Sequence, residues 1–487
     1  MRKKILVGIL CFLFTGTLVF FGIQFVTKTG FFRKPGDLLF AESFLDSDSE
    51  RYRGLFEETE LRGNITFSYV NSDSPWTPSN DSELGFLVDV FVPIGDFYET
   101  KTSITSDEFE EMYASGKDIV SVKNLAPTNK LLAVDNNYYL DSFDSGAKFK
   151  YLRIELADLR DKETVESVIQ PTLSSFPDKT SVLSFAQTGV TALGRALNTK
   201  MNEVGDGRYF SEKIASFLGS FDLTHTSNES SFSERANGAN ICSDERFIDT
   251  LTSIGLDVVE LTGNHNLDCG AEDAINTIDK YEMLGIKVVG GGRNAEEAAI
   301  PLAISQKGNS VTVLAYNQST GGATTDNTPG ANQYDEEDAK ARISEAKARG
   351  DTVIVDMQYY ECAEYDTSME TLTCTYADSS AGDQVGTFRS LIDFGADVVV
   401  GTSAHQTQTF ENYNGSQIYY GLGNIFFDQV WWPGTTKSLG LVHYFWNGKL
   451  IQTRKFGTIY DDTFQTRLMT DDELETFIKW LNSARSE

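Results

Sequence analysis

Apolar positions along the chain follow two spacings, and together they predict strands alternating with helices between residues 180 and 452. Runs rich in β-branched apolar residues are typical of short, buried strands. These runs cover residues 181–187, 223–227, 257–261, 287–290, 310–316, 352–358, 397–401 and 417–422. Apolar residues spaced three and four apart predict helices at 194–202, 208–218, 244–254, 271–284, 336–348 and 384–394. The alternation predicts a layered α/β domain.

Two other local patterns refine this prediction. Asn414-Gly415, between apolar stretches, predicts a β-hairpin. Residues 317–333 and 361–383 form long loops, and loops of this size within a compact domain are more often functional than idle.

The rest of the chain differs in composition, and we divide the whole into five parts. They are a cytoplasmic tip with a transmembrane signal anchor (1–27), a polar, acidic stalk (28–60), a smaller α/β domain of unknown role (61–178), the main domain (179–455) and a helical tail (456–487).

The N-terminal apolar segment runs from Ile5 to Thr27 without a charge. At about 1.5 Å per residue, it spans roughly 34 Å as a helix, enough to cross a bilayer. Arg2, Lys3 and Lys4 precede it and favour a cytoplasmic N-terminus. We therefore expect a single-pass protein of the cell membrane whose bulk is extracytoplasmic. A cleaved signal peptide is the alternative, and it also places the body outside.

The charge balance limits the partners. The chain carries a formal net charge of −30, which excludes nucleic acid as an expected partner because its phosphates would be repelled. Binding of any other polyanion would require a local basic patch or a cation.

Four cysteines lie beyond the apolar segment, and an oxidising compartment would allow them to pair. Cys362 and Cys374 bracket one loop and are the pair we favour. A Cys242–Cys269 bond is also open, although it would lie beside the histidine motif described next. No Cys-x-x-Cys spacing favours zinc.

The strongest chemical motif is Asn264-His265, which follows the strand at 257–261, with Asp268 three residues later. Open α/β sheets place their binding sites at the carboxyl ends of strands. Amide, imidazole and carboxylate groups are ligand types for a divalent metal. Asp268 also stands at the expected N-cap of the next helix. The alternative is that Asn264 and Asp268 only cap this helix and that His265 packs.

Other strand ends carry similar groups. His405 follows the strand at 397–401, and the two histidines are expected to converge on one cleft. Glu229 extends past the strand at 223–227, whereas His225 within it is expected to be a sheet histidine. Asn424 and Asp428 follow Gly421 and Gly423, and the strand at 352–358 ends at Gln358.

These motifs resemble those of the CapA family of capsule synthesis proteins, which belongs to the metallophosphatase-like superfamily and is tied to poly-γ-glutamate synthesis or export. The resemblance covers about residues 180–452. It is carried by 257–265 with Asp268 and Gly270, by 290–298, by 395–401 with Ala404-His405, by 413–415 and by 421–428. It implies a metallophosphatase-like (calcineurin-like) layered α/β sandwich.

The chain departs from the family at several positions. Val190 stands where the family usually has a metal-bridging Asp, Gln358-Tyr359-Tyr360 replaces His-Trp-Gly, and Thr402 or Ser403 replaces a histidine. Since a two-metal centre needs such ligands, the resemblance implies one divalent ion (Mn, Zn or similar) or none.

The residue roles follow from the motifs and the resemblance together. We predict Glu229, Asn264, His265 and His405 as metal ligands, and His265, His405 and Asp268 as catalytic residues, with Asp268 orienting His265. We predict that Asn424, Asp428, Gln358 and Arg195 bind substrate.

The resemblance implies a role in the synthesis, export or anchoring of a poly-γ-glutamate-type capsule polymer. The expected partners are the membrane, subunits of a capsule synthesis or export complex, and an anionic polymer or small cell-surface substrate. The alternative is a single-metal hydrolase or transferase, phosphatase-like or polymer-cleaving. Loss of the bridging Asp slightly favours the non-hydrolytic role.

Overall fold

A computed structural model describes residues 64–71, 84–143, 149–157, 177–318, 321–359 and 382–485. The apolar segment 5–27, the stalk, Cys362 and Cys374 lie outside these residues. No helix within the described ranges is long and apolar enough to cross a membrane. The described residues form two compact units: those within Met1–Ile94, Ser103–Asn124 and Leu132–Phe176 make the first, and those within Gly95–Thr102, Leu125–Leu131 and Pro177–Glu487 make the second.

The first unit is a small α/β structure. Its main sheet has the antiparallel order β1-β7-β2-β4. Its strands are β1 (Asn64–Asn71), β2 (Leu84–Asp96, which ends in the second unit), β3 (Ser103–Ile104), β4 (Ile119–Ser121), β6 (Ala133–Val134) and β7 (Lys150–Ala157). Its helices are α4 (Ser106–Ser115), η1 (Val122–Asn124) and α5 (Tyr139–Ser142). Thr105 begins α4 with a capping box, and Gly116 ends it.

The second unit contains two larger sheets. The first has the order β11-β10-β9-β8-β21-β22-β23, with β20 also pairing with β8. Its strands are β8 (Leu183–Thr191), β9 (Leu223–Asn228), β10 (Leu256–Glu260), β11 (Lys287–Val289), β20 (Asn424–Phe426), β21 (Lys437–Trp446), β22 (Lys449–Ile459) and β23 (Arg467–Leu468). The strands β8 to β11 run parallel, so their carboxyl ends meet at one edge.

The other large sheet has the order β13-β14-β16-β17-β19-β18. Its strands are β13 (Leu302–Gln306), β14 (Asn309–Asn317), β16 (Thr352–Gln358), β17 (Val398–Gly401), β18 (Phe410–Tyr413) and β19 (Ser416–Tyr419). The four central strands are parallel and the two edge strands are antiparallel. The short strands β5 (Asn129–Leu131), β12 (Gly291–Gly292) and β15 (Gly330–Ala331) also belong to this unit.

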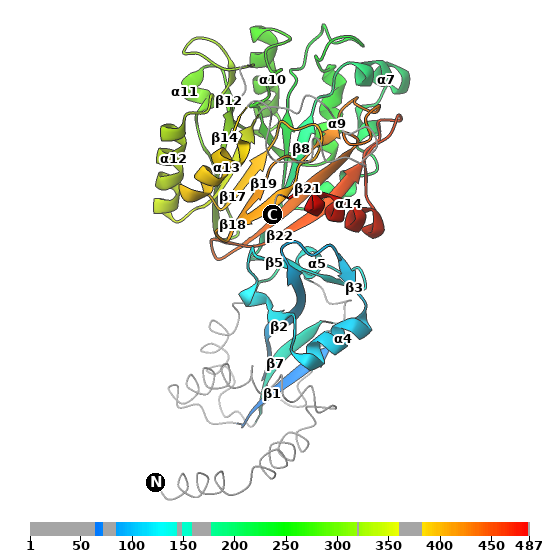
Figure 1. The fold of residues 1–487 in the computed structure, drawn as a ribbon, viewed down its shortest axis with the longest axis vertical. Coiled ribbons are helices and arrows are strands. Elements are labelled where there is room, and N and C mark those ends of the chain that lie inside the picture. Colours follow the sequence, from blue (N-terminus) through cyan, green and yellow to red (C-terminus); the bar gives the residue numbers. More distant parts are fainter. Residues whose placement is uncertain are drawn as a thin grey trace, which may run out of the picture. The chain divides into compact units, whose positions relative to one another are not determined.

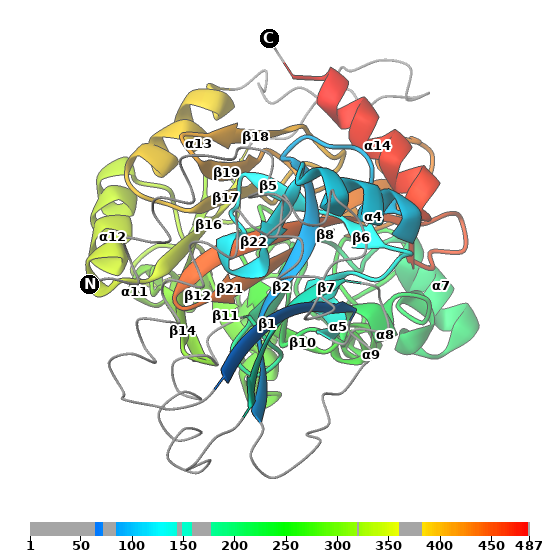
Figure 2. The same ribbon diagram turned by 90° about the horizontal axis from the view of Figure 1, so that it is seen from below.

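Helices surround the two sheets. They are α7 (Ala196–Val204), η2 (Gly207–Phe210), α8 (Ala215–Leu218), η3 (Glu245–Phe247), α9 (Ile248–Ser253), α10 (Ala271–Met283), α11 (Ala295–Ala298), α12 (Glu336–Arg349), α13 (Gln384–Asp393) and α14 (Asp471–Ser483). In Figure 2, α12 and α13 lie on the opposite side of the strands from α8 and α9.

Two apolar clusters explain this layering. The inner cluster lies between the sheets and includes Phe185 and Val258 from one and Val313 and Ile354 from the other. The outer cluster packs the alternate residues of β14, β16 and β17 against α12 and α13. Strands with both faces buried read as continuous apolar runs, which is why the sequence revealed them. The predicted α/β class is confirmed (Figure 1).

Several predicted elements differ in extent. The expected helix at 208–218 divides into η2 and α8, because the Phe210 carbonyl accepts a bond from Thr466 N rather than continuing a helix. The expected tail at 456–487 does not stand apart from the main unit. Its first residues complete β22, and Leu474, Phe477 and Ile478 of α14 join the inner cluster.

The longest hairpin of the second unit was not predicted. Strands β21 and β22 pair along their full length. Their turn is Asn447-Gly448, with φ of 51° and 72°, the left-handed conformation that Asn-Gly supplies in such turns. The same dipeptide at 414–415 gave the predicted hairpin of β18 and β19, so the signal was present twice.

Candidate functional site

Side chains from both sheets meet at the carboxyl ends of the parallel strands. Gln358 is the last residue of β16, Glu229 follows β9, and Asn264 follows β10. The amide Nε2 of Gln358 lies 3.3 Å from Oε1 of Glu229 and 3.1 Å from Oδ1 of Asn264. Glu229 and Gln358 are fully buried. The sequence thus placed three polar groups correctly at one end of the sandwich.

Hydrogen bonds fix the loop that carries Asn264. Thr262 donates through both its backbone N–H and its hydroxyl to the Glu260 carboxyl group. Asn317 Nδ2 donates to the Thr262 carbonyl at 2.6 Å. At Gly263, an added Cβ would lie 2.7 Å from Glu229 Cα, so only glycine permits this approach. The loop is therefore held from both sheets.

His265 lies within hydrogen-bond distance of Asp268, the residue predicted to orient it. Its Nδ1 lies 2.7 Å from Oδ2 of Asp268. A carboxylate accepts from Nδ1–H and leaves Nε2 as the acceptor of the neutral ring. The pair faces solvent, with 34% of the His265 side chain exposed. The prediction that Asp268 is the N-cap of α10 was wrong, because that cap is Gly270 and no side chain bonds to it.

A disulfide joins Cys242 to Cys269 directly beside this pair. It closes a loop of 27 residues and ties the Asn264–Gly270 segment to the chain after β9. Arg235 Nη2 donates to the Cys269 carbonyl and pairs with Asp273, the latter at 2.7 Å. The pairing that we left open from the sequence is therefore formed, while the favoured Cys362–Cys374 pair lies outside the described residues.

His405 and Asn424 form a second, buried group. Nδ1 of His405 lies 2.8 Å from Oδ1 of Asn424. Asn424 Nδ2 in turn donates to Gln429 Oε1 and to the Thr435 carbonyl. The His405 ring stacks on Phe427, with centroids 4.8 Å apart. Asn424 therefore orients His405.

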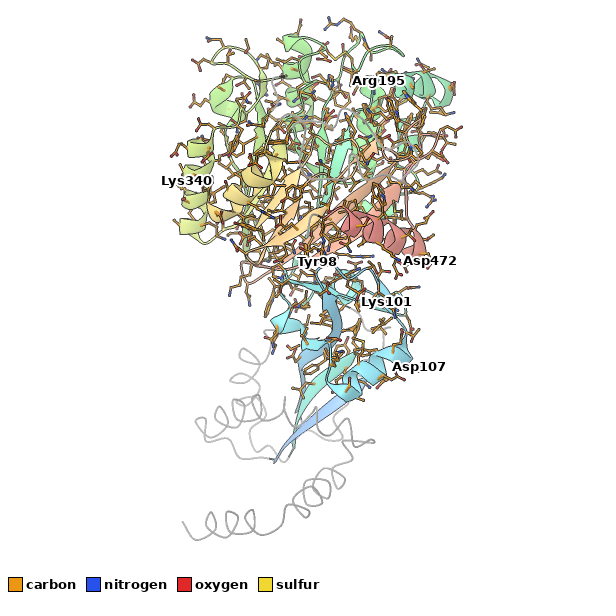
Figure 3. The ribbon with its side chains drawn as sticks, viewed as in Figure 1. Tyr98, Lys101, Asp107, Arg195, Lys340 and Asp472 are labelled. Carbon is orange, nitrogen blue, oxygen red and sulfur yellow. A yellow bond between two sulfur atoms is a disulfide. The ribbon has the colours of Figure 1, made fainter. Side chains whose placement is uncertain are left out.

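Arg195 and Asp428 lie close to this group. Figure 3 labels Arg195, which directly precedes α7. Arg195 Nε lies 3.2 Å from Asp428 Oδ2, and Nη2 contacts Oδ1. Asp428 is buried and also accepts a hydrogen bond from Ala196 N. The Arg195 side chain is 35% exposed. The guanidinium covers the Phe427 ring at 4.6 Å. The backbone φ of Arg195 is 50°, which is rare for a residue other than glycine. Such backbone strain often marks functional sites.

Beneath the site, a buried polar chain crosses between the sheets, and the sequence did not reveal it. His225 Nε2 lies 3.1 Å from Asp356 Oδ2. Gln187 Nε2 donates to Asp356 Oδ1, and Gln187 Oε1 lies 3.1 Å from His443 Nε2. Burial, together with His225, lowers the pKa of His443 to about 3, so this ring is neutral. Each of the four residues stands two positions from an apolar residue that faces the interior from the same strand. A polar residue at such a position is a weak sequence signal that could have revealed the chain.

Burial raises the pKa of Glu260, and the nearby Asp356 raises it further. The carboxyl group that shapes the Asn264 loop is therefore protonated more readily than an exposed glutamate.

The predicted metal ligands fall into separate groups. Glu229 and Asn264 meet at Gln358, His265 binds Asp268, and His405 binds Asn424. Across the described ranges, no three His, Cys, Asp or Glu side chains gather closely enough to hold a metal ion.

Comparisons with known proteins agree with these motifs. Residues 184–429, just over half of the chain, match the family described as bacterial capsule synthesis protein PGA_cap. The PGA biosynthesis protein CapA of Bacillus subtilis (strain 168) is 30% identical over 201 residues, which are 40% of this chain and 49% of that protein. The capsule biosynthesis protein CapA of Bacillus anthracis is 25% identical over 276 residues, which are 54% of this chain and 63% of that protein. The matches thus span less than two thirds of either relative.

Among solved structures, TT1561 of Thermus thermophilus is similar at a TM-score of 0.30 and 10% identity, over 55% of this chain and 100% of that one. The family match covers the strands and loops that build the site. The chain belongs to the bacterial capsule synthesis protein family PGA_cap and is a divergent, CapA-like member of it.

Proposed function

We propose that this chain acts in the synthesis, export or anchoring of a poly-γ-glutamate-type capsule polymer, through a cleft that binds the polymer or a partner of the export complex. The names of both relatives refer to capsule or PGA biosynthesis, which supports this class of function. The proposed architecture is metallophosphatase-like, in keeping with the two facing sheets covered by helices.

The observation that carries the proposal is a row of polar oxygens at three neighbouring strand ends. Asn317 ends β14, Gln358 ends β16, and Thr402 follows β17. Asn317 Oδ1, Gln358 Oε1 and Thr402 Oγ are buried and have no hydrogen-bond partner in the part of the chain that the structure describes. Buried oxygens of this kind are completed by ordered water or by a ligand. An amide-linked polymer supplies N–H donors that suit such a row, and because these oxygens are buried we propose that ordered water relays the contact.

Charge supports a specific contact rather than general attraction. A polyanion is repelled by a chain of net charge −30, so a local cation is needed. Arg195 is rigidly paired with Asp428 yet partly exposed. Its remaining N–H groups suit a carboxylate of the polymer.

The Cys242–Cys269 bond supports an extracytoplasmic location, because disulfides persist in oxidising compartments. We propose that residues 5–27 anchor the chain in the cell membrane with its bulk outside.

The test measures the amount of surface polymer in a capsule-forming strain from which its own copy of the gene has been removed. Wild-type chain is expected to restore the polymer, and His265→Ala to reduce it at equal protein level. Lys340→Ala, on the outer face of α12, is the matched control and should restore it fully. Normal polymer with His265→Ala and Arg195→Ala would contradict the proposed cleft.

A second candidate is hydrolysis or transfer on a cell-surface substrate, favoured by the His265–Asp268 pair. A carboxylate at 2.7 Å orients an exposed imidazole in the manner of a general base. Incubation of the polymer with the full chain, with and without Mn²⁺ or Zn²⁺, separates the two functions. Shortening of the polymer that His265→Ala abolishes would support hydrolysis, and unchanged length would support binding alone.

A further inference from the structure

The amide nitrogen of Gln358 lies between two oxygens that come from the other sheet. It is 3.1 Å from Asn264 Oδ1 and 3.3 Å from Glu229 Oε1. These oxygens come from the loops after two adjacent parallel strands, β9 and β10. The amide group thus links three strand ends across the interior of the sandwich.

The chemistry of the partners fixes which end of the amide faces them. A carboxylate accepts hydrogen bonds, so the group next to Glu229 is the NH₂ end. Its two hydrogens suit one acceptor each, Glu229 and Asn264. The opposite atom, Gln358 Oε1, is buried and has no partner among the described residues. The side chain is therefore held by its NH₂ group.

A carboxylate and an amide oxygen facing one point are an arrangement that commonly holds a hard cation. Here that point is taken by an NH₂ group, which carries partial positive charge and has no lone pair suited to a metal. Val190, which stands where the family usually has a metal-bridging Asp, is fully buried and pairs in the sheet with Ser227 on one side and Asn424 on the other. The residues present therefore do not fit the metal centre that the family resemblance implies.

We propose that the Gln358 amide substitutes for a cation in this chain: it bridges Glu229 and Asn264, and the cleft keeps its shape without a metal. The proposal rests on the proposed function for the use of this cleft and adds that the cleft works in the presence of chelators. It follows that the site depends on hydrogen-bond donors rather than on metal supply.

One substitution of nearly equal shape tests this. Gln358→Glu replaces the NH₂ group by an oxygen and leaves three oxygen-bearing side chains, two of them carboxyl groups, around one point. We expect this variant to gain about one equivalent of Mn²⁺ or Ca²⁺ and to melt at a higher temperature when the ion is added. Gln306→Glu on β13 makes the same chemical change away from the cleft and should gain neither.

The deciding measurement is the metal content of the full-length wild-type chain after equilibration with Mn²⁺, Zn²⁺ or Ca²⁺ and removal of excess ion. We expect well below one equivalent and no shift in melting temperature. A stoichiometric ion that is lost in Glu229→Gln would overturn the proposal and mean that Gln358 turns its oxygen inward. This result needs no variant of Gln358 to fold.

Polymer binding in the same preparation separates the two proposals. Metal-free wild-type chain that fails to bind polymer contradicts the proposed function and leaves the amide bridge standing. Wild-type chain that holds a stoichiometric ion and also binds polymer contradicts the amide bridge but not the proposed function.

Discussion

Nδ1 of His405 lies 2.8 Å from Oδ1 of Asn424. Asn424 begins β20, the short strand that pairs with β8, whereas His405 lies in the loop after β17. The hydrogen bond therefore connects the two sheets at their carboxyl ends and assigns the ring proton to Nδ1.

Replacing Asn424 tests this connection. Asn424→Leu removes the acceptor of a buried imidazole and the donor to Gln429 and Thr435, and we expect the free energy of unfolding to fall by about 2–3 kcal/mol. Asn424→Asp keeps the acceptor, so ¹⁵N chemical shifts should show His405 protonated at Nδ1 in this variant. A shift pattern of the opposite tautomer in wild-type chain would contradict the assignment.

The Arg195–Asp428 pair should be strongly coupled. Asp428 is 3% exposed and Arg195 35%, so solvent weakens the pair compared with a fully buried one, and we expect a coupling of about 1–2 kcal/mol. Arg195→Ala leaves a buried carboxyl group and should cost more stability than Asp428→Ala costs through its lost contact with Ala196 N. Denaturant unfolding of both single variants and the double variant measures the coupling, and additive effects would contradict it.

The Cys242–Cys269 bond should stabilise the loop that carries the His265–Asp268 pair. Closing a loop of 27 residues constrains the unfolded chain by about 3–4 kcal/mol in the chain-entropy account. We expect Cys242→Ser/Cys269→Ser to lose stability of that order and to bind polymer less tightly. Equal stability of the double variant and wild-type chain would mean that the bond constrains little.

Lys130 should make the second unit more stable as the pH rises. Burial lowers its pKa to about 8 from 10.5, while its Nζ donates to the Glu99 and Thr100 carbonyls. Between these two pH values the unfolded chain binds more protons at Lys130 than the folded chain does. The free energy of unfolding therefore rises with pH, by up to about 1.4 kcal/mol per pH unit.

Comparison of two methionine variants isolates this effect. Lys130→Met should remove the slope between pH 8 and 10.5, whereas Lys449→Met, at an exposed position at the start of β22, should keep it. Identical slopes in wild-type chain and Lys130→Met would contradict the lowered pKa of Lys130.

The sequence predicted the parallel strands and the polar groups after them well, because continuous apolar runs mark buried strands and because Glu229, Asn264 and Gln358 stand at their ends. Apart from the contact between Asp268 and His265, it did not predict which groups bond. Asp268 suited an N-cap by position, but its carboxyl group is taken by His265 and the chain enters α10 through Gly270. Pairing depends on distances across the two sheets, which no local pattern encodes.

Two other features depended on tertiary structure. Residues 95–102 and 125–131 read as part of the smaller domain, yet they belong to the second unit, where Phe97 packs on Phe410 and Lys455 Nζ donates to the Phe97 carbonyl. The polar chain from His225 to His443 lies on strands that carry apolar residues on the same face, and its contacts join residues far apart in the sequence.

The most direct test of the account is calorimetric titration of poly-γ-glutamate into the purified full-length chain with EDTA present. We predict saturable binding that weakens at least about tenfold, or roughly 1.4 kcal/mol, in Arg195→Ala and His265→Ala and is unchanged in Lys340→Ala. Absence of binding, or equal affinity for wild-type chain and both cleft variants, would contradict a polymer-binding cleft at these strand ends.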